Sequence, residues 1–132
     1  VSSFQAAAAA LARELTVPDV TQTVILTRGK GRTAVPERER LRDLAAHHAT
    51  MCIFLSAGLA NEVVAEIVDE YGEDCPAAIV YKVTWPDQKI IRTTLGRLPE
   101  AMKEAEITRT ALIFVGPALG SSGTRSKLYE AH

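Results

Sequence analysis

One stretch decides the fold of this chain: Ala78-Ile79-Val80-Tyr81-Lys82-Val83-Thr84-Trp85-Pro86-Asp87-Gln88-Lys89-Ile90-Ile91-Arg92-Thr93-Thr94. Two runs rich in apolar and β-branched residues, 78–83 and 89–94, flank a turn that contains Pro86 and Asp87. Proline fixes φ and aspartate accepts local backbone hydrogen bonds, so the stretch predicts a β-hairpin. The turn also holds Trp85, the only tryptophan of the chain, at a position where proteins concentrate binding groups.

Apolar runs and amphipathic segments on both sides of the hairpin predict the rest of the fold. Continuous apolar runs predict buried strands over 50–55 and 110–115, and alternation predicts a strand over 21–27. We expect helices over 4–15, from Pro36 to about residue 48, over 61–71 and over 99–105. The resulting order predicts an α/β fold, a mixed sheet with helices packed on it. Parallel neighbours should arise at the helical crossovers, and an antiparallel pair at the hairpin.

Length and composition limit the class of protein. With 132 residues, of which 47% are hydrophobic, we expect a single domain over 1–132, with a helix within 1–16 and a mobile tail over 117–132. The formal net charge is −1 and no block of like charge occurs, which argues against nucleic-acid or membrane partners. The apolar runs are shorter than the roughly 20 residues that span a bilayer. Two cysteines and no secretory signal favour the cytoplasm.

The first residues suggest that the chain is part of a longer protein. Ser2 and Gln5 have the spacing of a capping box, and Val1 would be the residue outside it. Because this helix start has almost no sequence before it, we expect a further domain on its amino-terminal side.

Few side chains suggest catalysis. His47, His48 and Cys52 are close in sequence, but adjacent histidines on a helix point about 100° apart, so a metal-dependent hydrolase is a weak hypothesis. The loops 29–33 and 120–124 contain glycine and hydroxyl residues but match no known phosphate-binding pattern. We find no nucleophile paired with a base, and binding is the activity that the residues favour.

The ends of three predicted strands form the better candidate site. The segments 55–58, 82–84 and 110–112 are apolar or small, with backbone groups available at strand ends. Ligands of open α/β sheets bind at such ends, and apolar walls with backbone donors and acceptors suit a flat heteroaromatic such as adenine. The alternative is that these segments are ordinary strand ends.

Several motifs resemble the tetrapyrrole (corrin/porphyrin) methylase family, in particular its branch that acts on precorrin-4 or cobalt-precorrin-4. The matching segments cover nearly the whole chain: 1–10, Gln22-Thr23-Val24-Ile25-Leu26-Thr27-Arg28, Gly31-Arg32-Thr33, Val35-Pro36-Glu37, His47-His48-Ala49-Thr50-Met51, Val80-Tyr81-Lys82, Thr84-Trp85-Pro86-Asp87-Gln88 and Ser126-Lys127-Leu128-Tyr129. The family has two α/β domains with the methyl donor between them, and this chain resembles the second one.

The resemblance implies an S-adenosylmethionine-dependent methyltransferase of cobalamin biosynthesis, usually a homodimer, with no metal required by the protein. It implies that the fragment alone is inactive and that no residue of this half acts as a catalytic acid or base. Transferred position by position, the donor-binding residues would be Ser2, Ser3, Leu55, Val83, Thr110 and Ala111. Arg28, Arg32 and Lys82 would contact the acidic side chains of the substrate. The alternative is a non-catalytic α/β domain that senses a ligand or mediates oligomerisation.

Overall fold

The computed structural model describes residues 3–11, 15–28, 40–82, 86, 88–107 and 110–120. Its helices are α1 (Ser3–Leu11), α2 (Leu41–Ala45), α3 (Ala60–Tyr71) and α4 (Leu98–Glu104), and its strands are β1 (Val24–Arg28), β2 (Thr50–Ser56), β3 (Pro76–Tyr81), β4 (Lys89–Thr94) and β5 (Thr110–Val115). Short 3-10 helices η2 (Ala57–Leu59), η3 (Leu95–Arg97) and η4 (Pro117–Gly120) follow β2, β4 and β5. The predicted order of helices and strands and the α/β class are confirmed.

The strands form one five-stranded mixed sheet in the order β1-β2-β5-β3-β4. Only β1 and β2 are parallel; β5 is antiparallel to both of its neighbours, and β3 is antiparallel to β4. Our expectation of parallel neighbours at every helical crossover is therefore wrong for two of them. The crossovers through α3 and α4 each skip one strand position, because β5 lies between β2 and β3, and β3 lies between β4 and β5.

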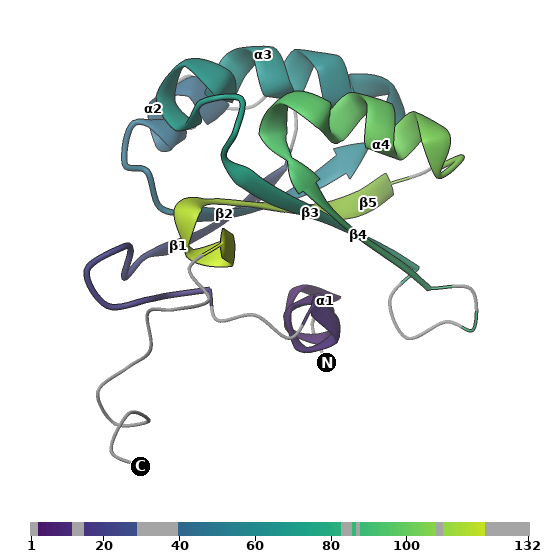
Figure 1. The fold of residues 1–132 in the computed structure, drawn as a ribbon, viewed down its shortest axis with the longest axis horizontal. Coiled ribbons are helices and arrows are strands. Elements are labelled where there is room, and N and C mark those ends of the chain that lie inside the picture. The colour runs from purple at the N-terminus through teal and green to yellow at the C-terminus, as the bar shows by residue number, and fades with distance from the viewer. Residues whose placement is uncertain are drawn as a thin grey trace.

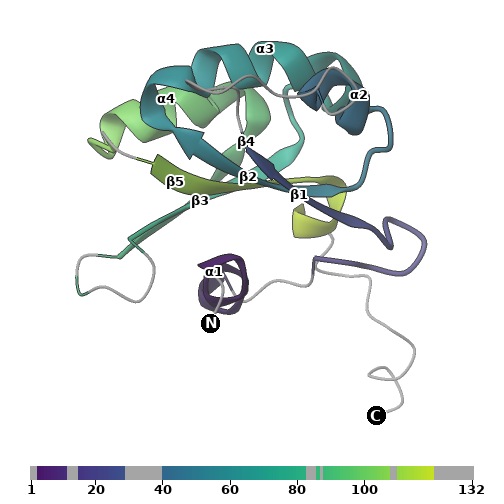
Figure 2. The same cartoon turned by 180° about the vertical axis from the view of Figure 1, so that it is seen from behind.

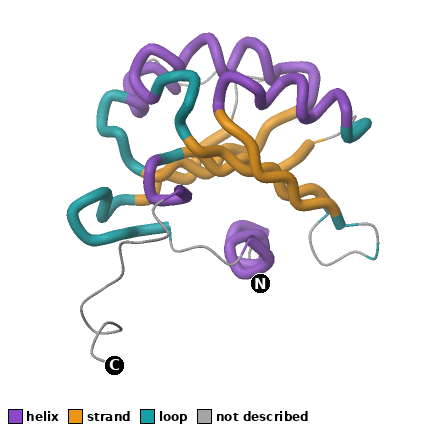
Figure 3. The backbone as a smooth tube through the Cα atoms, viewed as in Figure 1, coloured by secondary structure: helices purple, strands orange, loops and turns teal. Residues whose placement is uncertain are grey.

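Helices cover the two faces of the sheet unequally. Helices α2, α3 and α4 lie side by side on one face, and α1 lies on the other (Figures 1 and 2). The tube in Figure 3 shows the same layers, with the sheet between them. None of the helices in the described part of the chain is both long enough and apolar enough to cross a membrane.

Alternation along the strands divides the core in two. Side chains that face α2, α3 and α4 form the larger helix-side core, which includes Met51, Ile53 and Leu55 of β2 and Ile113 of β5. Side chains on the opposite face form the smaller α1-side core: Ala7, Leu11, Cys52, Ala78, Val80, Leu112, Phe114 and Leu119. Both faces of β5 are thus buried, as its continuous apolar sequence predicted.

Several predicted boundaries need correction. The first helix is described over Ser3–Leu11; residues 12–14 of the predicted helix lie outside the described residues, and Leu15 is not helical. Strand β1 begins at Val24 because Thr21 instead pairs with Val17 across a tight turn. Of the predicted helix from Pro36 to 48, residues 36–39 lie outside the described residues and α2 spans only Leu41–Ala45. The expected mobile tail is wrong for residues 117–120, which form η4 with Leu119 buried. The tail beyond residue 120 and most of the Trp85 turn lie outside the described residues.

Gly116 ends β5 at a place that has no room for a side chain. Its φ is +151°, and a Cβ there would lie 3.1 Å from Cα and 3.3 Å from Oγ1 of Thr50. Its backbone N–H donates to the carbonyl oxygen of Pro76 at 3.2 Å. Glycine at this position therefore lets β5 pass close to the start of β2 while remaining bonded to β3.

We predict that Gly116→Ala lowers the free energy of unfolding by about 1–3 kcal/mol, because it combines an unfavourable φ with a close contact. Urea denaturation followed by circular dichroism measures the change. Gly58→Ala is the matched control, because a Cβ at Gly58 would meet no atom within 4 Å. Equal effects of the two substitutions would contradict the packing argument.

Candidate functional site

Four strand termini meet at one edge of the sheet. Because β1, β2 and β3 run in one direction and β5 runs in the other, the carboxyl ends of the first three lie beside the amino end of β5. The register pairs Leu55 with Ala111 and Ser56 with Thr110, one strand from Arg28, which pairs with Phe54. The sheet thus brings together residues that lie up to 83 positions apart in the sequence, and we call this region the strand-end edge.

Leu55 and Ala111 lie at the centre of the strand-end edge. Their side chains belong to the helix-side core, where Leu55 is completely buried and Ala111 is 4% exposed. In the described structure, therefore, they contribute a packed apolar surface below the edge. A ligand that approached here would meet mainly the backbone of these strand ends.

The other predicted donor-binding residues are placed only in part. Thr110 is the first residue of β5 and lies opposite Ser56. Ser3 is the first residue of α1, on the face of the sheet opposite α3 and α4. Ser2 and Val83 lie outside the described residues, although Val83 directly follows Lys82 at the end of β3.

Two of the three predicted basic residues lie on this edge. Arg28 ends β1 and Lys82 follows β3, and both side chains are exposed. Three strand spacings separate β1 from β3, about 14 Å, which is a distance that a large polycarboxylate can bridge. Lys82 has a φ of +51°, and its Nζ lies 5.6 Å from the ring centroid of Tyr81. The third residue, Arg32, lies outside the described residues.

The left-handed conformation of Lys82 marks a turn in the chain. A non-glycine residue in this region has an unfavourable backbone conformation and is worth attention near a binding site. Here it redirects the chain immediately after β3, where the Trp85 turn begins. The sequence gives no indication of this conformation, because lysine has no preference for it.

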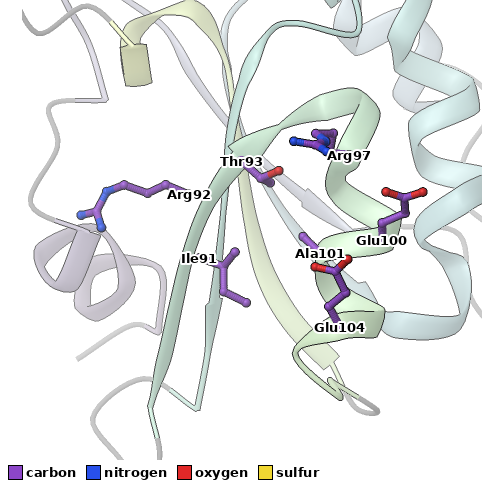
Figure 4. A pocket seen from close by; sticks show the side chains of 7 residues that line it. All are labelled: Ile91, Arg92, Thr93, Arg97, Glu100, Ala101 and Glu104. Atoms are coloured by element: carbon purple, nitrogen blue, oxygen red, sulfur yellow. The ribbon is translucent and has the colours of Figure 1, made fainter.

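A separate pocket of about 230 Å³ lies between β4 and α4. It is lined by Ile91, Arg92, Thr93, Arg97, Glu100, Ala101 and Glu104, none of which is a predicted site residue. Figure 4 shows the carboxylates of α4 on one side of β4, while the Arg92 side chain extends to the other side, toward α1. The pocket is thus distinct from the strand-end edge.

The histidines and cysteines do not converge on a metal. The Nε2 atom of His48 lies 2.7 Å from Oε2 of Glu70, an exposed pair beside Tyr71, on the side of α3. Cys52 is buried in the α1-side core, and burial raises the pKa of its thiol to about 12. Among the described residues, no group of three His, Cys, Asp or Glu could hold a metal ion. The hydrolase hypothesis therefore has no site geometry to support it in this part of the chain.

The fold defines an α/β protein with a mixed sheet and a candidate binding edge at its strand ends. The tetrapyrrole (corrin/porphyrin) methylase family matches residues 1–99, three quarters of the chain, so this chain belongs to that family. The family that the sequence motifs suggested is thereby confirmed.

The chain is similar along nearly its full length to two groups of curated relatives. It is 50% identical to the cobalt-precorrin-4 C(11)-methyltransferase of Priestia megaterium, covering 98% of this chain and 52% of that protein. It is 48% identical to the precorrin-4 C(11)-methyltransferase of Sinorhizobium sp, again over 98% of this chain and 52% of the relative. The chain thus spans about half the length of the curated relatives it matches.

Solved structures agree with this assignment. The structure of a cobalt precorrin-4 methyltransferase, described as a cobalamin biosynthetic enzyme, matches with a TM-score of 0.86 and 52% identity, over 90% of this chain and 50% of that one. A uroporphyrin-III C-methyltransferase from Thermus thermophilus, in complex with S-adenyl homocysteine, matches with a TM-score of 0.66. That second match has 16% identity and shows only the shared fold.

The buried thiols predict a loss of stability in alkali. Burial raises the pKa of Cys52 to about 12, and burial, partly offset by a backbone hydrogen bond from Gly116, raises that of Cys75 to about 11. A group with a raised folded pKa contributes stability below its unfolded pKa of 9.0, and that contribution is lost as the pH rises toward the folded value. The free energy of unfolding should therefore fall above pH 9, by up to about 1.4 kcal/mol per pH unit for each thiol.

Urea denaturation between pH 7 and about pH 11 measures this decline, with a Cys52→Ala, Cys75→Ala double variant as the comparison. The double variant should lose less stability over the same interval. Burial also raises the pKa of the Tyr71 hydroxyl above its ordinary value of 10.0. The double variant should therefore still lose stability at the alkaline end of this interval. An identical decline in both proteins would exclude the thiols as its cause.

Proposed function

We propose that this chain is the carboxyl-terminal domain of an S-adenosylmethionine-dependent precorrin-4 or cobalt-precorrin-4 C(11)-methyltransferase of cobalamin biosynthesis. Sequence identity of about 50% to named methyltransferases, over 98% of the chain, is the observation that supports this function most strongly. Because the chain corresponds to half of those relatives, we propose that the other half supplies a second domain. Turnover would then require both domains.

The strand-end edge is the proposed methyl-donor site. Its central residues, Leu55 and Ala111, offer an apolar surface with strand-end backbone groups, which suits an adenine ring. Thr110 and Val83 would border the ring on either side, and Ser2 and Ser3 would reach the donor from the start of α1. The sulfonium of the donor carries a methyl group that is already activated. This domain therefore needs only to bind and orient the donor.

Basic residues at the same edge are the proposed substrate contacts. The tetrapyrrole substrate carries several carboxylates, and Arg28, Arg32 and Lys82 would form charge-assisted hydrogen bonds with them. A guanidinium can bind a carboxylate through two parallel bonds, which fixes orientation as well as affinity. The substrate would then lie across the edge, with a ring carbon directed at the donor.

This arrangement accounts for the lack of a catalytic acid or base among the candidate residues. The ring carbon forms a bond to the methyl carbon while the carbon–sulfur bond breaks; the electron pair of that bond passes to sulfur, and the positive charge passes from sulfur to the tetrapyrrole. The residues of this domain contribute by holding two ligands in line and by excluding water. Such alignment can lower a barrier by roughly 7–11 kcal/mol. In this proposal the protein requires no metal ion, is located in the cytoplasm and acts as a homodimer.

A turnover assay of a full-length protein that contains this chain tests the function. The protein should transfer one labelled methyl group from S-adenosylmethionine to precorrin-4 or to its cobalt complex, and a comparison of the two substrates decides between them. Donor binding without transfer to either would favour the alternative, a ligand-sensing domain. Transfer by residues 1–132 alone would disprove the need for a second domain.

Donor binding can be located directly by amide NMR. We expect S-adenosylhomocysteine at millimolar concentration to shift the amide signals of Leu55, Lys82 and Ala111. Signals from the opposite ends of the same strands, such as Thr50 and Val115, should stay unchanged and serve as the internal control. Shifts confined to the pocket between β4 and α4 would place the donor elsewhere.

Substitution of the basic residues should separate substrate binding from chemistry. In the full-length protein we expect Arg28→Ala and Lys82→Ala each to raise KM for the tetrapyrrole roughly 10-fold or more, the effect of losing one bond to a charged group, with a smaller change in kcat. Lys103→Ala, on the exposed side of α4, is the control and should leave KM unchanged. If both Arg28→Ala and Lys82→Ala keep the wild-type KM, these two residues do not bind the substrate.

A further inference from the structure

Arg92 links the edge strand β4 to the end of α1. Its side chain leaves β4 on the face opposite α4 and extends toward α1 (Figure 4). Its Nη2 atom donates a hydrogen bond of 2.7 Å to the carbonyl oxygen of Leu11, the last residue of α1. The two residues are 81 positions apart, so only the folded sheet brings them together.

The carbonyl that Arg92 binds belongs to the last described residue of α1. The carbonyl groups of the last turn of an α-helix point along the helix axis toward its carboxyl end, where the helix dipole places negative partial charge. Within Ser3–Leu11, the last turn of α1 contains no basic residue. The guanidinium of Arg92 therefore brings both a hydrogen bond and a positive charge from β4 to this end of α1.

The described packing of α1 on the sheet is apolar. Among the described side chains of this helix, Ala7 and Leu11 are buried in the α1-side core and Ala8 packs against it. Apolar contacts are non-directional, and a face made largely of alanine methyl groups offers few features that would prevent sliding along the sheet. A directed hydrogen bond at one end of the helix restricts both sliding and rotation.

A second bond restrains the chain just beyond α1. The hydroxyl of Thr50, a buried polar group at the start of β2, donates to the carbonyl oxygen of Leu15. Arg92 and Thr50 thus bind carbonyls on either side of residues 12–14, from two different strands of the sheet. Of these two bonds, the one from Arg92 acts on the helix itself.

We infer that Arg92 is a positioning residue for the methyl-donor site. By fixing the carboxyl end of α1, it sets the direction of the helix and so the place of Ser3, the first residue of α1, at the other end. This inference rests on the proposed function, because it assigns that serine to the donor. Arg92 itself makes no contact with the donor and takes no part in the transfer.

The test measures the dissociation constant of S-adenosylhomocysteine by calorimetry, together with amide hydrogen exchange of α1, in the full-length protein. Arg92→Met should weaken donor binding roughly ten-fold, and it should speed exchange in α1 while β2 and β5 remain protected. Arg92→Lys keeps a cation without the planar donor geometry and should restore part of the affinity. Arg97→Met removes a neighbouring exposed arginine that points to the α4 side, and it should change neither quantity.

The outcomes separate this inference from the proposed function. Faster exchange in α1 with unchanged donor affinity would mean that Arg92 only stabilises the fold, and this would overturn the inference. Wild-type exchange in α1 after Arg92→Met would overturn it as well. If the wild-type protein does not bind S-adenosylhomocysteine, the donor site itself is wrong. If Arg92→Met does not fold, Arg92→Lys provides the same two measurements, with a smaller expected loss of donor affinity.

Discussion

The fold depends on the pairing of β5 with strands on both of its sides. It bonds to β2 across six residue pairs and to β3 across four, and no other strand among the described residues joins the two halves of the sheet. Without β5, the pairs β1–β2 and β3–β4 would be isolated two-stranded ribbons, which are marginally stable in water. Because β5 follows the other described strands in sequence, these contacts are non-local, and the sheet cannot be completed until residues 110–115 are present.

The same strand also creates the candidate site. Leu55 and Ala111 are neighbours only because β5 lies between β2 and β3. Arg28 and Lys82 then lie on opposite sides of this pair, at the ends of strands that run parallel to β2. An edge built from four separate segments is rigid at its base, because the strands below it are buried. The residues that follow each strand lie in loops, and loops tolerate sequence differences between members of one family.

In the proposed function, methyl transfer depends on the alignment of two ligands. Such chemistry would need no nucleophile or base from the residues of this half, which agrees with a sequence that pairs no nucleophile with a base. What it needs is precise placement, and placement depends on contacts such as those of Arg92 and Thr50 with backbone carbonyls. Such contacts carry no recognisable pattern, which is why the sequence motifs indicated this role for neither residue.

The sequence by itself determined the order of the strands and helices, the buried character of β2 and β5, and the family, because these follow from local composition and from motifs within short segments. It placed the boundaries of β5 correctly, but it extended the first helix to Leu15, which is not helical, and predicted a mobile tail where η4 packs. Only the tertiary structure decided that β5 separates the crossover strands, that Lys82 adopts a left-handed conformation and that Arg92 caps α1. These features depend on contacts between residues far apart in the chain, and periodicity and residue preference report only on near neighbours.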